Sequence, residues 1–389
     1  MTPLRVGIDA AALRRPESGI GRYTAGLIRG LSDSFPEDDL RAYVAGPARG
    51  VNDQLPIGVR LGSLPLPLRI LPWTWRVLSW PGVEAVIGPV DVFHTSDWTH
   101  PPQRSGATVT TVHDLGPLDH PEWYEPRIAE RHRVVNKITV GRAHRIIAVS
   151  EFTRDRLLHH YPEAEGRVVV VPSGVSPDFD PGPAPGDEGV AGLPRMPSRF
   201  LLYVGSAEPR KNLTGLLRIF RGVALQDPEL FLVLAGLTGS RESQAIDGSA
   251  SWTLDPVDRA DLEGDVAERV VGLGLVTRSH LVTLYRRAEA FLFPTLYEGF
   301  GLPVLEAMAT GCPVIASNRT AVPEVAAQAA VLADPSDEDA FAQAVLQVVS
   351  SRERQQALRL AGLARAGEFT WERTARETRE VYLEAAEAG

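Results

Sequence analysis

Residues 290–317 read AFLFPTLYEGFGLPVLEAMATGCPVIAS, and this stretch decides the fold. The apolar run Ala290–Pro294 has the length of a buried strand, and a glycine-rich loop follows it. Pro303 suits the first turn of a helix. Pro313–Ser317 is a second apolar run of strand length. The order strand, loop, helix and strand is typical of a parallel α/β sheet.

The same alternation runs through both halves of the chain. We predict strands at Arg5–Asp9, Ala42–Ala45, Asp91–His94, Thr108–His113, Arg145–Ser150, Val168–Val171, Phe200–Gly205 and Leu230–Gly236, besides the two above. Helical periodicity occupies Ile20–Ser34, Pro126–Val140, Glu151–Tyr161, Asn212–Gln226, Ser279–Ala288 and the region from Glu338 to the end. The predicted fold class is therefore α/β, with two Rossmann-like, doubly wound parallel-sheet domains facing a cleft.

The chain is too long for one ordinary core, at 389 residues. Residues 177–199 are rich in proline and glycine and are predicted to link two domains. We place the first domain at 1–172, the second at 173–367 and a final helix, containing Trp371, at 368–389. Residues 239–265 are polar and are predicted to form a mobile excursion. Trp73, Trp75 and Trp80 are expected to pack a helix into the core or to form a wall at a binding site or a membrane edge.

Composition excludes some classes of protein. The net charge is −9, which argues against nucleic-acid binding. Cys312 is the only cysteine, so an intramolecular disulfide is excluded and a reducing compartment fits. The N-terminus lacks a secretory pattern and no stretch has the length and hydrophobicity of a membrane span. We expect a cytoplasmic protein and leave open a peripheral position at the inner face of the membrane.

Glycines open the first predicted helix. Gly19 and Gly21 in GIGRYT would let the backbone approach a phosphate, or would simply form a turn. The third glycine of the dinucleotide fingerprint is missing, and no matching acid follows Ala42–Ala45. An NAD-dependent oxidoreductase with the same sheets is therefore disfavoured.

Two further motifs follow strands of the second domain. Arg210 and Lys211, in GSAEPRKN at 205–212, suit neutralisation of a diphosphate without a metal, unless they are a solvated basic pair. In the 290–317 stretch, Glu298 stands on the loop and Glu306 on the helix. With the loop amides of Phe300, Gly301 and Leu302 they could hold sugar and ribose hydroxyls; the alternative is a helix cap with a surface acid.

Histidine and acidic spacings do not indicate a metal. The nine histidines include no H-x-H or H-E-x-x-H pattern, and no D-x-D element ends a strand. We expect neither a metal nor a cofactor. His113 has the best position of the histidines, because it ends a predicted strand at the cleft.

These motifs together resemble family 4 of the retaining glycosyltransferases, which have the GT-B fold. The resemblance rests on E-x7-E from Glu298 to Glu306, and on GIGRYT, TVHDL at 111–115, AVSEFTRD at 148–155, EPRKNL at 208–213 and FTWERTARE at 369–377. It covers nearly the whole chain. It implies an acceptor-side first domain, a second domain that binds a nucleotide sugar, and a last helix that packs back on the first domain through Trp371.

The resemblance also implies roles for single residues. Glu306 would bind the donor ribose and Glu298 the hydroxyls of the donor sugar. Arg210 and Lys211 would hold the diphosphate. His113 would lie beside the donor sugar, and Gly21 would approach the phosphate or the acceptor. The chain departs from many members at Ser206, where they carry an arginine, so more of the phosphate neutralisation is assigned to Arg210 and Lys211.

The family implies retention of the anomeric configuration. No nucleophile for a double displacement is evident in the first domain, so we favour front-face transfer. The segments around TVHDL and FTWERTARE are most similar to bacterial mannosyltransferases that use GDP-mannose, and UDP- or dTDP-sugars stay open as donors. The acceptor would be a saccharide or a lipid-linked saccharide of polysaccharide biosynthesis. A non-catalytic nucleotide-sugar-binding protein, an epimerase and a phosphorylase are the competing interpretations.

A basic series lies between residues 127 and 145. It comprises Arg127, Arg131, Arg133, Lys137, Arg142 and Arg145. Such a series could attract an acidic acceptor such as a lipid diphosphate, or it could be a solvated helix face.

Overall fold

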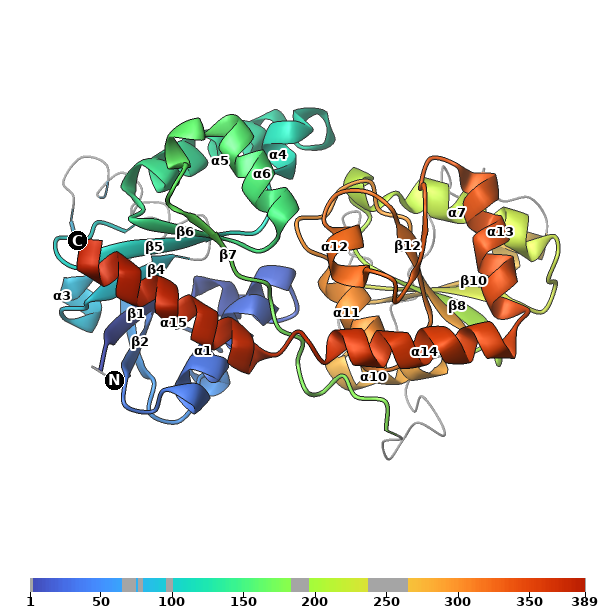
Figure 1. The fold of residues 1–389 in the computed structure, drawn as a ribbon, viewed down its shortest axis with the longest axis horizontal. Helices are drawn as coiled ribbons and strands as arrows, with labels where there is room; N and C mark the ends of the chain where they lie inside the picture. The colour runs from blue at the N-terminus through green and yellow to red at the C-terminus, as the bar shows by residue number, and fades with distance from the viewer. Residues whose placement is uncertain are drawn as a thin grey trace. The chain divides into compact units, whose positions relative to one another are not determined.

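The computed structural model describes residues 3–64, 75, 80–95, 101–182, 196–236 and 265–388. The chain divides into two compact units, residues 1–174 with 369–389, and residues 175–368. The divisions at 174 and 369 lie beside the predicted 172 and 368. Each unit is a parallel sheet between helices, which confirms the predicted fold class of two Rossmann-like α/β domains (Figure 1).

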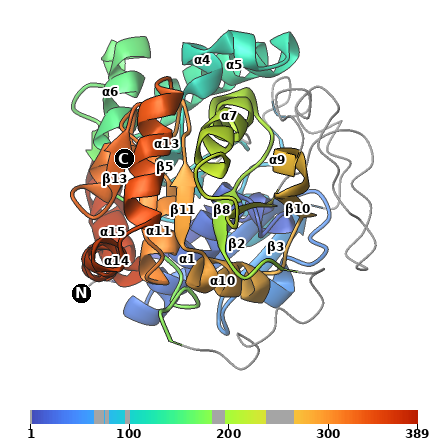
Figure 2. The same cartoon turned by 90° about the vertical axis from the view of Figure 1, so that its right-hand side faces the viewer.

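The first unit contains a seven-stranded sheet with the order β3-β2-β1-β4-β5-β6-β7. Its strands are β1 (Arg5–Asp9), β2 (Asp39–Ala45), β3 (Arg60–Leu64), β4 (Val92–Thr95), β5 (Ala107–Val112), β6 (Arg145–Ala148) and β7 (Val168–Val170). Its helices are α1 (Gly19–Ser34), α3 (Glu84–Ile87), α4 (Gly116–Asp119), α5 (Pro126–Arg142), α6 (Glu151–His160) and α15 (Trp371–Ala388). In both views α4, α5 and α6 lie on one face of the sheet, and α1 and α15 on the other (Figures 1 and 2).

The second unit contains a six-stranded sheet with the order β10-β9-β8-β11-β12-β13. Its strands are β8 (Phe200–Val204), β9 (Phe231–Ala235), β10 (Val270–Gly274), β11 (Ala290–Phe293), β12 (Val314–Ser317) and β13 (Val331–Ala333). Its helices are α7 (Leu213–Ala224), α9 (Asp265–Glu268), α10 (Arg278–Arg287), α11 (Leu302–Ala309), α12 (Val322–Ala326), α13 (Glu338–Val349) and α14 (Arg352–Ala366). Figure 2 shows α7 and α13 on one face of this sheet, with α10 and α11 on the other.

The sequence prediction missed three strands: β3, β10 and β13. Each of them lies at an edge of its sheet, where one side of the strand has no neighbour. Their residues are partly exposed, and these strands are polar (RLGSL), interrupted by glycine (VVGLG) or very short (VLA). The central strands β8 and β11 are fully buried and were predicted within one residue. This is the pattern expected when burial on both faces produces the apolar signal.

Each sheet has one point at which the strand order reverses. In the first unit it lies between β1 and β4, and in the second between β8 and β11. Neighbouring strands whose crossovers run to opposite sides leave a crevice at their carboxyl ends, where α/β proteins bind ligands. The loops after β8 and β11 are residues 205–212 and 294–301, which are the loops that carry the strongest predicted motifs.

The last helix, α15, packs on α1 and on β4, β5 and β6. The Thr374 hydroxyl donates to the Pro172 carbonyl at 2.8 Å. Arg379 forms a buried two-point ion pair with Asp38, with donor–acceptor distances of 2.7 and 3.0 Å. Because α15 lies some 340 residues from Asp38 in sequence, this pair ties the end of the chain to the first sheet.

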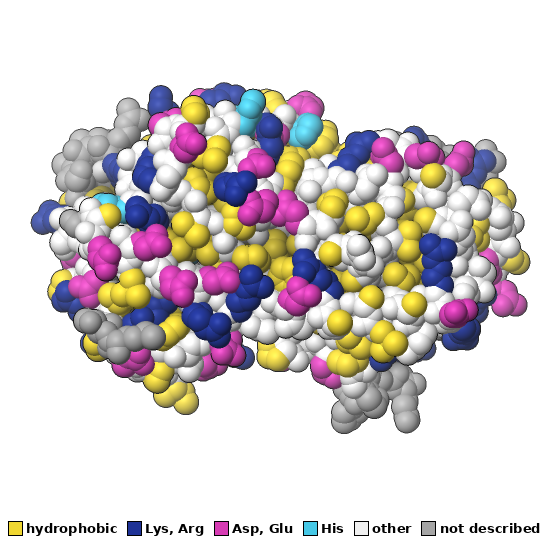
Figure 3. Space-filling model, in the orientation of Figure 1, with side chains coloured by type: hydrophobic (Ala, Val, Ile, Leu, Met, Phe, Trp, Pro, Cys, Tyr) yellow, Lys and Arg dark blue, Asp and Glu magenta, His cyan; other side chains and the backbone are white. Residues whose placement is uncertain are grey.

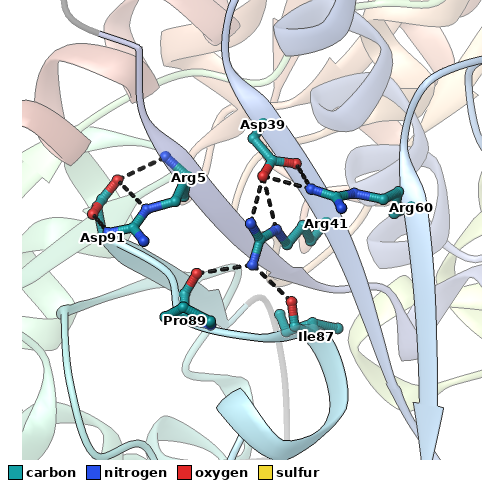
Figure 4. A network of polar contacts seen from close by, with 7 residues as sticks. All are labelled: Arg5, Asp39, Arg41, Arg60, Ile87, Pro89 and Asp91. Atoms are coloured by element: carbon teal, nitrogen blue, oxygen red, sulfur yellow. Dashed lines mark hydrogen bonds and ion pairs between the residues drawn. The ribbon is translucent and has the colours of Figure 1, made fainter.

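The amino ends of the first sheet carry a separate ion-pair network (Figure 4). Arg5 pairs with Asp91, while Arg41 and Arg60 both pair with Asp39. Arg41 also donates to the carbonyls of Ile87 and Pro89, both at 2.8 Å. These contacts join β1, β2 and β3 to the loop before β4, at the end of the sheet opposite to the switch point.

Three predictions fall wholly or partly outside the described residues. These are Trp73, the linker at 177–199, of which 183–195 are not described, and the excursion at 239–265, of which only Asp265, the start of α9, is described. Trp75 is half-buried against the cluster that contains Tyr43 and Phe93, and Trp80 is exposed.

Candidate active site

The loop after β8 holds Arg210 and Lys211 in a short 3₁₀ helix, Pro209–Lys211. Asn212 follows in the left-handed conformation, with φ 55° and ψ 46°, which asparagine adopts more readily than most residues. Its side-chain oxygen caps α7 by accepting from the Gly215 amide at 3.3 Å. Its side-chain nitrogen donates to the Pro294 carbonyl at 3.0 Å. Asn212 thus fixes the basic loop against the loop after β11.

A second set of contacts joins the same two loops. The Arg210 carbonyl accepts from the Leu296 amide at 2.8 Å and from the Thr295 hydroxyl at 2.9 Å. β8 and β11 are neighbours, with Leu201 paired to Ala290. Adjacent strands therefore bring together two loops that are more than eighty residues apart in sequence.

Lys211 and Glu298 meet at this junction. The Lys211 ammonium contacts Glu298 Oε1, and Arg210 Nη1 lies 3.3 Å from the same oxygen. Lys211 is 8% exposed and Glu298 is 7% exposed. The ammonium also lies 5.2 Å from the centre of the Phe293 ring. Two cations thus converge on one buried carboxylate oxygen.

A further acid orients Arg210. Glu208 Oε2 accepts from Arg210 Nε at 2.7 Å, and Glu208 Oε1 accepts from the Ser206 hydroxyl at 2.8 Å. Burial alone would raise the pKa of Glu208, but Arg210 and Ser206 outweigh it and hold that pKa below its usual value. Ser206, where many members of the resembled family carry arginine, therefore helps to position the arginine that remains.

Burial lowers the pKa of Lys211 from its usual value, and the contact with Glu298 offsets part of the effect. Taking an ammonium and a carboxylate out of water costs several kcal/mol per ion, which their attraction repays only with good geometry. Such burial is common where charge is needed for chemistry. The cluster is thus a candidate functional site on physical grounds.

Glu298 is held by the backbone as well as by its carboxylate. Its amide donates to the Thr320 hydroxyl at 3.1 Å, and its carbonyl accepts from the Ala321 amide at 3.4 Å. Thr320 itself has φ 60°, which is uncommon for a β-branched residue. Sequence reasoning missed Thr320, and its position after β12 was the only available signal.

Glu306 lies on α11, one helical turn beyond the loop, and is 2% exposed. The Tyr285 hydroxyl of α10 donates to Glu306 Oε2 at 3.4 Å, near the long limit for a hydrogen bond. Gly301 begins the helix with φ 115°, a conformation that disfavours any side chain. Phe300, Gly301 and Leu302 thus form the turn into α11, with Glu298 and Glu306 before and after it. The two acids lie on one loop–helix unit, as predicted.

His113 and Gly21 belong to the first unit. His113 follows the carboxyl end of β5. The rings of His113 and Tyr23 pack edge to face, with their centroids 4.7 Å apart. The Tyr23 hydroxyl lies 3.0 Å from Thr111 Oγ1. His94 Nε2 lies 2.8 Å from the same oxygen.

Sequence reasoning missed this support beneath His113. His94 is fully buried, and burial, with the neighbouring His113, lowers its pKa to about 3. Its Nδ1 lies 2.6 Å from the Tyr382 hydroxyl of α15. His94 is therefore neutral and links the strand under His113 to the last helix.

Gly21 is required by its own loop. A Cβ there would lie 2.3 Å from the Arg15 carbonyl oxygen, closer than real side-chain contacts. The Gly21 amide donates to the side chain of Ser18, which caps α1, at 3.0 Å. The glycine thus has a packing role in addition to any ligand contact, and its predicted phosphate or acceptor contact stays a prediction.

The basic series predicted at 127–145 is split by the structure. Arg145 begins β6 and pairs with Glu384 at 3.2 Å. The others lie on α5, where Arg133 pairs with Glu130 at 2.6 Å. In the described part of the chain no group of three or more His, Cys, Asp or Glu side chains could hold a metal ion. None of the described helices combines the length and hydrophobicity that a membrane span needs.

Comparison with known proteins agrees with this architecture. Residues 191–364 match the model of glycosyl transferases group 1, and residues 18–179 match that of glycosyltransferase family 4. The chain is 32% identical over 299 residues to the O-antigen chain mannosyltransferase B of Escherichia coli, covering 72% of this chain and 71% of that protein. It is 27% identical to the serotype-specific mannosyltransferase WbdA of Escherichia coli, covering 69% of this chain but only 32% of that longer protein.

Solved structures share the fold. Sucrose-phosphate synthase from Thermosynechococcus elongatus superposes with a TM-score of 0.76 at 21% identity, covering 99% of this chain and 100% of that one. WaaG, a glycosyltransferase involved in lipopolysaccharide biosynthesis, superposes with a TM-score of 0.69 at 15% identity, covering 97% and 99%. Two family models match the chain, a relative is more than 30% identical to it, and each of its units is built on a Rossmann-like sheet. The chain therefore belongs to the family 4, group 1 glycosyltransferases of GT-B fold.

Proposed function

We propose that this glycosyltransferase transfers mannose from GDP-mannose to a saccharide or glycolipid acceptor, with retention and without a metal ion. The observation that carries the proposal is the buried cluster of Arg210, Lys211 and Glu298 at the switch point between β8 and β11. Mannose is supported by the names of the relatives, O-antigen chain mannosyltransferase B and mannosyltransferase WbdA.

The two cations act on the departing diphosphate. Cleavage of the bond between the anomeric carbon and the phosphate oxygen leaves negative charge on that oxygen. Fixed cationic donors in a site shielded from water stabilise such charge without reorganising during the reaction. The guanidinium of Arg210, held by Glu208, and the ammonium of Lys211 can do this in place of a metal ion.

The acids hold the donor. Glu306 accepts from the ribose hydroxyls of the nucleotide. Glu298 accepts from the hydroxyls of the mannose, and the amides of the Phe300–Leu302 turn bind phosphate oxygens near the start of α11. Because Glu298 already contacts Lys211, donor binding must redirect part of that contact to the diphosphate. His113, and the loop of Gly21 in the first unit, are assigned to the sugar and to the phosphate or acceptor.

Transfer proceeds on one face of the sugar. The acceptor hydroxyl attacks the anomeric carbon from the side of the leaving group, and the departing phosphate oxygen takes the hydroxyl proton. The glycosidic bond forms as the bond to phosphate breaks, so the products are the mannoside and GDP. Retention follows because the acceptor replaces the diphosphate on the same face.

The test combines donor choice with chelation. The protein is incubated with octyl α-mannoside and GDP-mannose, UDP-glucose or dTDP-glucose, with and without EDTA, and the products are analysed by mass spectrometry and by NMR of the anomeric proton. We expect transfer from GDP-mannose alone, unchanged by EDTA, with an α-linked product. A UDP- or dTDP-sugar product would replace the donor assignment. Loss of activity in EDTA, restored by a divalent ion, would overturn metal independence.

A variant at the proposed ribose site tests the role of Glu306, and product analysis distinguishes an enzyme from a protein that only binds the nucleotide sugar. Glu306→Ala removes the proposed ribose acceptor, so donor use should be abolished, whereas exposed Arg352→Ala should retain it. Near-normal turnover by Glu306→Ala would refute the role of Glu306. Tight, stoichiometric GDP-mannose binding by the unaltered protein, without product from any mannoside tested, would favour a non-catalytic nucleotide-sugar-binding protein.

Contact with a membrane is proposed through α5. Its outward side exposes Ile128, Val134 and Ile138 by 40–49%. Arg127, Arg131 and Lys137 are exposed on the same helix. Apolar side chains among cations are typical of helices that lie on anionic lipid surfaces. Co-sedimentation with phosphatidylglycerol vesicles but not with phosphatidylcholine vesicles is expected, and Val134→Asp should weaken it; equal binding of both vesicles would contradict the proposal.

A further inference from the structure

On the face of the first sheet beneath α5, the amino half of β5 is polar, beside an apolar cluster that contains Val112, Val140 and Ile146. Thr108 and Thr110 of β5 point away from Thr111, since successive side chains of a strand alternate between faces. Thr111 contacts Tyr23 and His94 on the side of α1 and α15. Parallel strands covered by helices are normally apolar on both faces. The α5 side of β5 therefore departs from what packing alone requires.

A cavity of about 480 Å³ lies at this place. It is lined by Thr95 of β4, Thr108 and Thr110 of β5, Thr139 and Arg142 of α5, and His144 before β6. The cavity opens to solvent where Arg104, Ser105 and Arg142 are exposed, and its volume lies within the range of about 300–1,000 Å³ found for ligand sites. The size is that of a small-molecule site, and the hydroxyl lining suits a polar ligand.

His144 presents a hydrogen-bond donor. Its Nδ1 accepts from the Thr108 amide at 3.0 Å. In a neutral imidazole the proton is therefore on Nε2. Thr108 and Gln103, by contrast, are engaged with each other, because the Thr108 hydroxyl donates to Gln103 Oε1 at 2.8 Å. The donor capacity left for a ligand thus lies with His144, Thr110 and the arginines.

The cavity is cationic. Arg104 and Arg142 line it, and its lining residues include no aspartate or glutamate. Within the described ranges Arg142 forms no ion pair. Glu84 contacts the loop that contains Arg104 and Ser105. Its Oε1 accepts hydrogen bonds from the amides of these two residues at 2.7 and 3.0 Å. The half-buried Trp75 adds an aromatic wall, with an indole N–H that has no partner among the described residues.

We propose that this cavity binds a phosphorylated monosaccharide. The arginines would hold the phosphoryl group by charge-assisted hydrogen bonds. His144 and Thr110 would bind the sugar hydroxyls, and Trp75 would cover the ring. The site is separate from the transfer site, because it lies beside the amino half of β5 whereas His113 follows the carboxyl end. It stands independently of the proposed donor and reaction.

Calorimetric titration of the whole protein with mannose 6-phosphate, mannose and inorganic phosphate tests the proposal. We expect saturable binding of mannose 6-phosphate, at least about tenfold tighter than of either fragment. Arg142→Gln should weaken it by about tenfold or more, and the near-isosteric Thr110→Val by several-fold. Arg29→Gln, an exposed arginine of α1 on the other face of the sheet, should leave it unchanged.

Competition distinguishes this cavity from the donor site. Binding should persist in the presence of saturating GDP and in Lys211→Ala. Absence of binding by the unaltered protein at millimolar ligand would overturn the proposal. So would binding that Lys211→Ala abolishes and Arg142→Gln leaves intact, and inorganic phosphate binding as tightly as mannose 6-phosphate would overturn recognition of the sugar.

Discussion

Two clusters of basic side chains and carboxylates lie at opposite ends of strands in the two units, and they differ in exposure. At the amino ends of the first sheet, Arg5 and Arg60 have side chains that are 48% and 68% exposed (Figure 4). At the carboxyl ends of the second sheet, the side chains of Lys211 and Glu298 are both 9% exposed. Most charges of the first cluster therefore stand partly in water, Arg41 being the exception at 12% exposed, whereas those of the second are largely out of water.

The exposed cluster is explained by local pairing. Arg41 and then Arg60 hold the pKa of Asp39 below its usual value, by donating hydrogen bonds to it. Exposed pairs of this kind contribute at most about 1 kcal/mol. Figure 3 shows basic and acidic side chains intermingled in the same way over the part of the first unit that contains α15. Such surfaces need no ligand to account for them.

The buried cluster is not explained by local pairing. Its burial costs free energy that apolar side chains of similar size would not cost. Charge arranged in this way at a strand switch point is better accounted for by a charged ligand. Both clusters combine basic side chains with carboxylates. The candidate site differs from the surface cluster because its charges are buried and because they lie at the carboxyl ends of the strands.

The largest effect on stability is expected at the buried pair of Arg379 and Asp38, whose side chains are 2% and 1% exposed. Arg379→Ala leaves Asp38 buried without its partner and should lower the free energy of unfolding by about 3–5 kcal/mol. Arg376→Ala on the same helix, 57% exposed, should change it by less than about 0.5 kcal/mol. Urea unfolding measures both, and equal effects would show that burial does not set the difference.

Removal of Lys211 should affect turnover. Lys211→Ala deletes one of the two donors that we propose for the leaving group and should lower kcat about 10²–10³-fold. Arg352→Ala, on an exposed helix end, should not. Both are measured by release of GDP from GDP-mannose in the presence of acceptor, with circular dichroism to confirm folding. A loss below tenfold in a folded Lys211→Ala protein would remove Lys211 from the site.

The pH dependence should reflect the burial of Lys211. The role that we propose for Lys211 needs the protonated amine, so kcat/KM for the donor should fall as pH rises through the pKa of Lys211. Because burial lowers that pKa, the fall should come below the ordinary value of 10.5. Lys211→Arg keeps its charge at these pH values, so its remaining activity should fall only at higher pH. An identical fall in both proteins would assign it to another group.

The smallest effect is expected in the exposed cluster. Arg60→Ala removes a 2.6 Å pair with Asp39 and should cost no more than about 1 kcal/mol of stability, with no change in kcat. The cost should shrink further in 1 M salt, which screens exposed charges. A loss above 2 kcal/mol, or a change in turnover, would mean that the amino-end network matters beyond its exposed pairs.

Much of the fold was predictable from the sequence, because central strands are buried on both faces. β8 and β11 are continuous apolar runs for that reason, whereas the missed strands β3 and β13 lie at sheet edges and are only partly buried. The loop motifs were predictable too, since Arg210, Lys211 and Glu298 directly follow strongly predicted strands. Their proposed roles in donor binding stay predictions.

Other parts of the site depend on distant contacts that no local pattern contains. Thr320 holds the Glu298 amide from the loop after β12. His94 contacts Tyr382 across 288 positions of sequence. Neither residue belongs to a motif, so periodicity and spacing could not identify them.

The sequence by itself determined that strands and helices alternate, that two parallel sheets form and that charged loops follow particular strands, because these features depend on hydrophobic periodicity over short distances. Tertiary structure decided that β8 lies beside β11, that Lys211 and Glu298 share one buried contact and that Asp38 meets Arg379. Strand order and burial depend on how the whole chain packs, and residues far apart in sequence become neighbours only when that packing is complete.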